Sequence, residues 1–123
     1  MTRPETFSMQ SRLKSFAYAF SGFKHFFRTE HNAWIHALAT LFVIPFSFVM
    51  KISPMEWVAI VFAIAFVWIT EMPNTAVEKT MDHLSPDEHP QVKLIKDVAA
   101  AAVSTASVAA CVIAFIIYIP KLL

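Results

Sequence analysis

Three long apolar segments dominate the hydropathy pattern of the chain. Residues 33–50 contain no Asp, Glu, Lys or Arg, and neither do residues 98–119. Residues 55–73 are apolar between Glu56 near the start and Glu71 near the end. Each segment has about the 20 residues that a helix needs to cross a bilayer. The pattern therefore predicts three membrane-spanning helices over these ranges.

Residues 10–29 have the pattern of a helix that lies on a membrane surface. Their apolar positions recur at steps of three and four, at Leu13, Phe16, Phe20, Phe23 and Phe27. Basic side chains occupy much of the remaining surface, which is typical of helices in the headgroup layer. The alternative is a helix that packs on a soluble core. The segments together predict one all-α domain over residues 1–123, with three transmembrane helices preceded by an amphipathic interfacial helix.

The composition also favours a membrane protein. The chain is 57% hydrophobic, contains 12 Phe and is only 15% charged. A soluble protein of this size could not bury so much apolar surface. The formal net charge is +1 and the cations are spread along the chain, so we expect no nucleic-acid partner. A single cysteine, Cys111, excludes an intramolecular disulfide.

The distribution of Lys and Arg predicts the orientation. Five of these cations precede the first span and three lie between the second and third, whereas only Lys51 and Lys121 fall on the other side. Cytoplasmic loops carry the excess of Lys and Arg. We therefore expect a multi-pass protein of the bacterial cytoplasmic membrane, with a cytoplasmic N-terminus, a cytoplasmic loop over residues 71–97 and an external C-terminus.

A row of polar residues follows the second span. Glu71, Asn74, Glu78 and Asp82 are spaced so that all four lie on one face of a helix. A carboxylate at a membrane boundary is costly, up to about 3 kcal/mol at full depth. Three acids and one amide on one face of a membrane helix therefore indicate a functional site.

Three acids are expected at one membrane level. Glu30 precedes the first span, Glu71 ends the second and Asp97 starts the third, which suggests one polar cluster at the cytoplasmic end of the bundle. Hard oxygen ligands without cysteine favour Mg²⁺ over zinc. Mg²⁺ is usually held by carboxylates together with substrate phosphates, which points to ATP.

The phosphate site cannot be a glycine-rich loop. The only glycine is Gly22, so Walker A and kinase-type loops are excluded. The negative charge of the phosphates would be neutralised by the metal and by cations such as Arg12, Lys93 and Lys96. A minimal site of this kind suffices for phosphoryl transfer, which needs mainly positioning and charge neutralisation.

Glu71 has the position of a general base for a lipid hydroxyl at headgroup depth. The alternative is that these acids pair with Lys and Arg on neighbouring helices. His31 and His36 are five apart, a poor spacing for metal ligands, and a structural hydrogen bond is the better interpretation of both. The three tryptophans are interpreted as lipid-facing or interfacial anchors.

Four segments, Ser15–Gly22, Glu30–His36, Glu71–Asp82 and Lys96–Asp97, carry a family resemblance. In order and spacing the chain resembles the small prokaryotic diacylglycerol kinase/undecaprenol kinase family. The resemblance implies three membrane helices with a surface helix. It also implies a homotrimer with composite active sites between subunits and MgATP bound on the cytoplasmic side.

The resemblance also implies roles for single residues. Glu30 and Glu78 would hold the metal, Glu71 would act as the base, and Asn74 would orient that region as a second catalytic residue. The nucleotide site would comprise Tyr18, Glu78, His89, Lys96 and Asp97, together with Arg12, which is proposed for its charge alone. Two departures stand out: Trp34 occupies a position that is often Arg or Lys, and Pro73 predicts a kink or a break in the second span.

The sequence therefore predicts a lipid kinase that uses ATP and Mg²⁺ to phosphorylate a membrane alcohol. The segments around Tyr18 and His36 look more like the undecaprenol kinase branch than the diacylglycerol-specific branch. One alternative is a non-catalytic trimer of the same fold, which the intact set of acids disfavours. A small ion transporter is disfavoured because the acids lie at one end of the spans, whereas transport sites usually lie near the midplane.

Overall fold

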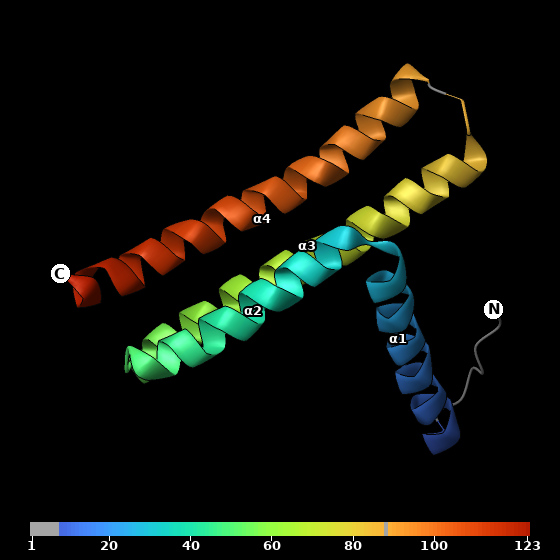
Figure 1. Ribbon diagram of the computed structural model, residues 1–123. Coiled ribbons are helices and arrows are strands. Elements are labelled where there is room, and N and C mark those ends of the chain that lie inside the picture. Colours follow the sequence, from blue (N-terminus) through green and yellow to red (C-terminus); the bar gives the residue numbers. More distant parts are fainter. Residues whose placement is uncertain (1–7, 88) are drawn as a thin grey trace.

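In the computed structural model, residues 8–87 and 89–123 are described, and they form four helices. These are α1 (Met9–Thr29), α2 (His31–Val49), α3 (Pro54–Leu84) and α4 (Pro90–Leu122). Residues 1–7 and Glu88, which belong to the predicted single domain, lie outside the described part of the chain. The helix α3 packs against both α2 and α4, whereas α1 leaves the group at a steep angle from the start of α2 (Figure 1).

The all-α fold and the three long apolar helices predicted from the sequence are confirmed. The helices α2, α3 and α4 are each long and apolar enough to cross a membrane. The last two are much longer than the predicted spans over residues 55–73 and 98–119. The extra turns are polar, and they continue until Ser85 caps the end of α3 and His89 caps the start of α4. Hydropathy marks the part of a helix that faces lipid and not the point at which the helix ends.

Local signals explain where each helix begins. The Ser8 side chain accepts a hydrogen bond from the backbone of Ser11 at 3.0 Å and caps α1. Ser53 and Glu56 form a reciprocal capping box at the start of α3. The helices α3 and α4 each begin with proline at the first helical position, where the missing N–H costs nothing. Between α1 and α2 only Glu30 is extended, so the chain turns there within one residue.

A kink or a break was predicted at Pro73, and the break is wrong, because α3 runs without interruption from Pro54 to Leu84. A proline inside a helix removes one backbone hydrogen bond and costs about 3 kcal/mol. Membrane helices tolerate this loss, because no other backbone conformation satisfies the remaining polar groups in lipid. Pro45 and Pro120 likewise lie inside α2 and α4.

The most buried contacts lie at the end of the bundle that carries the α2–α3 turn. Ile52, Ile60, Ile117 and Tyr118 form a buried cluster there. Beside this cluster, the Lys121 ammonium of α4 lies 3.2 Å from the Glu56 carboxylate of α3. Elsewhere the three long helices leave large apolar side chains exposed.

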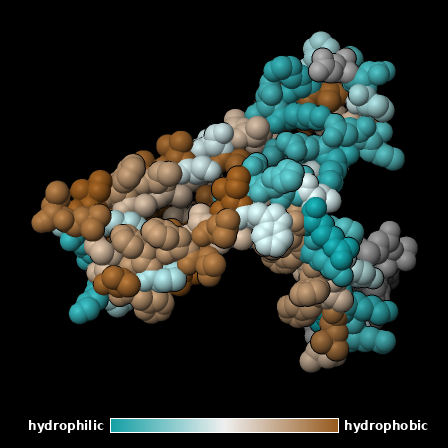
Figure 2. Space-filling model, in the orientation of Figure 1, coloured by the Kyte–Doolittle hydropathy of each residue, from teal (hydrophilic) through white to brown (hydrophobic). Residues whose placement is uncertain are grey.

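The surface is divided between an apolar and a polar part. Figure 2 shows apolar residues over the α2–α3–α4 bundle, and hydrophilic residues gathered towards the α3–α4 connection and along parts of α1. So much exposed apolar surface requires lipid or other copies of the chain around the bundle. The polar part is therefore the part that meets water, and the acids of α3 lead into it.

Candidate active site

Glu71 is the buried acid of the bundle. Its residue is only 3% exposed, and its Oε1 atom lies 2.8 Å from the Nε2 atom of His36 on α2. A carboxylate that is removed from water needs a hydrogen-bonding partner. Sequence reasoning anticipated a structural hydrogen bond for His36 but not that its partner would be Glu71. The available signal was that consecutive spans run antiparallel, which brings the start of the first predicted span, with His36, close to the end of the second, with Glu71.

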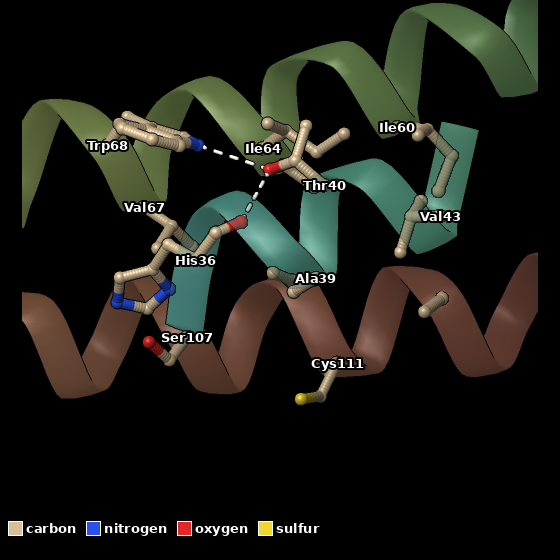
Figure 3. A pocket seen from close by; sticks show the side chains of 13 residues that line it. His36, Ala39, Thr40, Val43, Ile60, Ile64, Val67, Trp68, Ser107 and Cys111 are labelled. Carbon is tan, nitrogen blue, oxygen red and sulfur yellow. Dashed lines mark hydrogen bonds between the residues drawn. The ribbon is translucent and has the colours of Figure 1, made fainter. Parts of the chain in front are cut away.

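A second link joins α2 to α3 beside this pair. The Trp68 Nε1–H donates to Thr40 Oγ1 at 3.3 Å, and the Thr40 hydroxyl donates to the backbone oxygen of His36 at 2.8 Å (Figure 3). Trp68 precedes Glu71 by three residues, so both lie on the same side of α3. The backbone of His36 and the carboxylate of Glu71 are thus both held at the α2–α3 contact.

Aromatic rings connect α1 to the same place. The Trp68 ring lies 6.1 Å from Phe26 and 5.6 Å from Phe27 between ring centroids. Trp34 packs on Phe27 at 5.4 Å and donates its Nε1–H to the Phe27 backbone oxygen at 2.8 Å. The interpretation of Trp68 as a lipid-facing anchor is therefore incomplete, because its ring joins α1 to α3 and its N–H bonds to α2.

An apolar cavity of about 300 Å³ lies between α2, α3 and α4, and His36, the partner of Glu71, is among its lining residues. His36, Thr40 and Trp68 line one part of it, and Ser107 and Cys111 of α4 contribute its other polar atoms (Figure 3). The remaining lining is aliphatic. The cavity therefore has a chemistry that suits a hydrocarbon chain, with a carboxylate near one end.

Beyond Glu71, the polar face of α3 continues as predicted. The Asn74 amide nitrogen lies 3.5 Å from Glu78 Oε1, and the Asn74 Oδ1 atom is buried with no hydrogen-bond partner among the described residues. An unpaired buried oxygen next to a carboxylate is an oxygen-donor set of the kind that Mg²⁺ prefers. Asn74 and Glu78 therefore fit the predicted metal chemistry.

The far end of this face reaches a charged cavity of about 580 Å³ between the end of α3 and the start of α4. Asp82 pairs there with Lys96, and Lys93 lies 2.6 Å from Asp97. His89, which also lines the cavity, caps α4 by accepting a hydrogen bond from the Gln91 backbone at 3.1 Å. Three residues predicted to contact nucleotide, His89, Lys96 and Asp97, are thus brought together.

The structure corrects the expectation of one polar cluster at a single level. Glu71 pairs with His36, whereas Asp97 lies beside the Asp82–Lys96 pair. Asp82 follows Glu71 by eleven residues, which is about 16 Å along a helix. Asp97 was placed too close to Glu71 because α4 was expected to begin at residue 98, whereas it begins at Pro90.

The other predicted site residues lie on or next to α1. Arg12 and Tyr18 are exposed on that helix, and Glu30 is half-buried at the α1–α2 break. Among residues 8–87 and 89–123, no three His, Cys, Asp or Glu side chains form a group that could hold a metal ion by themselves.

Comparison with known proteins identifies the family. Residues 17–118 match the family model of the prokaryotic diacylglycerol kinases. The undecaprenol kinase of Bacillus subtilis is 38% identical over 109 residues, which cover 89% of each chain.

Two diacylglycerol kinases are also similar. That of Synechocystis sp. is 31% identical over 112 residues, which are 90% of this chain and 64% of that protein. That of Pseudomonas aeruginosa is 31% identical over 103 residues, which are 80% and 84% of the two chains. The resemblance seen in the sequence is confirmed, and the chain belongs to the prokaryotic diacylglycerol kinase family.

Proposed function

We propose that this protein is an ATP- and Mg²⁺-dependent lipid kinase. It transfers the γ-phosphoryl group of ATP to the hydroxyl group of a membrane alcohol, undecaprenol or diacylglycerol. One observation carries the proposal: the buried Glu71 carboxylate lies by an apolar cavity, and the polar face of α3 leads from it to a charged cavity. This arrangement offers a place for a lipid at one end and for a nucleotide at the other.

Glu71 acts as the general base. The acceptor hydroxyl gives its proton to the carboxylate as its oxygen forms a bond to the γ-phosphorus atom. The bond between that phosphorus atom and the β–γ bridging oxygen breaks, and ADP leaves. Because the carboxylate is buried and bonded through Oε1, its Oε2 atom is the one available to the hydroxyl.

Glu78 and Glu30 would hold the metal. The Asn74 amide nitrogen lies 3.5 Å from Glu78 Oε1, and its buried Oδ1 atom has no hydrogen-bond partner among the described residues. When bound, Mg²⁺ would supply charge neutralisation for the phosphates of ATP. Asn74 is placed between the base and Glu78 on the same face of α3. It therefore orients the region in which the γ-phosphate and the acceptor hydroxyl meet.

The nucleotide binds at the charged cavity between α3 and α4. Lys96 meets phosphate charge as a compact cation, and His89 and Asp97 offer hydrogen-bonding groups to the nucleoside. Arg12 and Tyr18, which are exposed on α1, are the other residues that we propose to contact the nucleotide. About 16 Å of helix separates Glu71 from Asp82, which is a length that suits an extended nucleoside triphosphate.

Undecaprenol is the preferred acceptor of the two. The Trp68 and Thr40 hydrogen-bond donors at the apolar cavity are already used within the protein. Of the other polar lining side chains, Ser107 offers one hydroxyl and Cys111 a weak thiol donor to the ester carbonyls of a diacylglycerol, whereas a prenyl alcohol presents only a hydroxyl and a hydrocarbon chain. The 38% identity to an undecaprenol kinase also supports this choice.

We further propose that the protein lies in the bacterial cytoplasmic membrane with its N-terminus inside and its C-terminus outside. The helix α1 lies in the headgroup layer, with Phe16 and Phe20 among its exposed apolar side chains. Three copies form a homotrimer, which covers part of the apolar surface that a single chain leaves exposed. Exposed apolar surface of this extent supports both lipid contact and self-association.

The direct test is transfer of labelled phosphate from ATP to each lipid by the purified protein in mixed micelles, with and without Mg²⁺. We expect labelled undecaprenyl phosphate that depends on Mg²⁺, and a higher Mg²⁺ requirement in Glu78→Gln. An unchanged Mg²⁺ requirement in that variant would remove Glu78 from the metal site. A folded protein that binds MgATP but labels neither lipid would favour a non-catalytic trimer.

A further inference from the structure

The partner of the proposed base comes from a different helix. Glu71 lies on α3, and His36, which bonds to its Oε1 atom at 2.8 Å, lies on α2. The Glu71 side chain is 5% exposed and that of His36 is 21% exposed. The pair is therefore shielded from most solvent, where a hydrogen bond to a carboxylate is stronger than at a surface.

The hydrogen bond limits the positions that the carboxylate can take. A glutamate side chain has three rotatable bonds, and burial alone does not select one orientation of its carboxylate. Contact with His36 fixes Oε1 and so directs Oε2 elsewhere. A base that must meet a hydroxyl within hydrogen-bond distance benefits from this restriction, because a displacement of about 1 Å can lower a rate by about 100-fold.

His36 is itself held in place. Its backbone oxygen accepts a hydrogen bond from Thr40, which in turn accepts one from Trp68 of α3. Trp68 and Glu71 are three residues apart on the same helix. The backbone of His36 is thus linked, through Thr40, to the turn of α3 that precedes the carboxylate.

We propose that His36 is a positioning residue for phosphoryl transfer. Its Nε2–H donates to Glu71 Oε1 and keeps Oε2 available to the acceptor hydroxyl. The hydroxyl proton moves to Oε2 of Glu71, and no proton is transferred to the imidazole. This inference rests on the proposed function, since it assigns His36 a role only if Glu71 is the base.

The test compares two substitutions at one position. In His36→Gln, the side-chain amide nitrogen lies close to where Nε2 lies in histidine, so the donor is kept. His36→Leu keeps a similar volume but has no donor. The matched control is His31→Gln, the same change at an exposed histidine in the first turn of α2.

We expect His36→Leu to lower kcat by about 100-fold, the effect of a misplaced base, with a KM for MgATP that changes by less than about twofold. The kcat of His36→Gln should be at least about tenfold higher than that of His36→Leu, because glutamine keeps the donor. His31→Gln should behave like the wild type. Full activity of His36→Leu would overturn the proposal, and so would equal losses in the Leu and Gln variants.

A second measurement does not depend on activity. In protein with ¹⁵N-labelled histidine, the imidazole nitrogen shifts of His36 should change in Glu71→Gln, whereas those of His31 should not. Unchanged His36 shifts would overturn the contact itself. Suppose that the His36 shifts change in Glu71→Gln but the wild-type protein phosphorylates no lipid. This result would refute the proposed function and with it the positioning role. An active wild type with a fully active His36→Leu variant would refute the positioning role alone.

Discussion

Removing the Tyr118 hydroxyl should destabilise the protein less than removing the Ser47 hydroxyl, although the two groups share one hydrogen bond. Ser47 is fully buried on α2, and its Oγ atom lies 2.8 Å from the Val43 backbone oxygen and 2.5 Å from the Tyr118 hydroxyl of α4. The Val43 oxygen can only accept, so it takes the single Ser47 proton. The Tyr118 hydroxyl must therefore donate to Ser47 Oγ.

The magnitudes follow from what each change leaves behind. Tyr118→Phe deletes a donor, and Ser47 keeps its bond to Val43, so the cost is that of one hydrogen bond, about 0.5–1.5 kcal/mol. Such bonds between membrane helices average about 0.6 kcal/mol. Ser47→Ala instead leaves the Tyr118 hydroxyl buried without its partner, which costs about 1–3 kcal/mol. The double variant should cost less than the sum of the two, because Phe removes the hydroxyl that Ala leaves unpaired.

Reversible unfolding in mixed micelles, followed by near-ultraviolet circular dichroism, gives the free energy of each variant. Kinase turnover should stay unchanged, because this contact lies at the opposite end of the bundle from Glu71. A larger loss in Tyr118→Phe than in Ser47→Ala would refute the assignment of donor and acceptor. Additive losses would show that the two hydroxyls do not interact.

Three further predictions concern other parts of the chain. Lys51→Gly should stabilise the protein by about 0.5–1 kcal/mol in the same unfolding assay, because Lys51 has a φ of 53°, which glycine adopts without strain. Phe27→Ala removes the ring contacts that hold α1, each worth about 1 kcal/mol. Trypsin should therefore cleave after Arg28 about tenfold faster, whereas Ser21→Ala, at an exposed polar position of α1, should leave that rate unchanged. Lys96→Ala should raise the KM for MgATP about tenfold through loss of a phosphate contact, and the same change at exposed Lys79 should not.

The sequence was sufficient to predict the helices but not their full lengths. Apolar runs identify the parts that face lipid, and these three parts are present in α2, α3 and α4. The polar turns from Asn74 to Leu84 and from Pro90 to Asp97 carry no lipid signal, so the second span was expected to end at residue 73 and the third to begin at residue 98, although the helical spacing from Glu71 to Asp82 was recognised. Ser85 and the His89–Pro90 pair mark the true ends. Because these capping signals were not recognised, Asp97 was expected at the same level as Glu71.

The acids of the site could be predicted, but their partners could not. The helical spacing places Glu71, Asn74 and Glu78 on one face whatever surrounds α3. The contact of Glu71 with His36 depends on how α2 and α3 are rotated about their axes, and no local pattern fixes this rotation. The continuity of α3 at Pro73 depends in the same way on the environment of the helix rather than on the local sequence.

The most direct test of the account measures MgATP binding and lipid phosphorylation in wild type and Glu71→Gln side by side. Glutamine keeps the size of the side chain but cannot accept the hydroxyl proton. We predict that kcat falls by about 100-fold or more, as expected for loss of a general base, while the Kd for MgATP stays the same. Equal turnover in the two proteins, or loss of MgATP binding in Glu71→Gln, would contradict the role of Glu71 as the base.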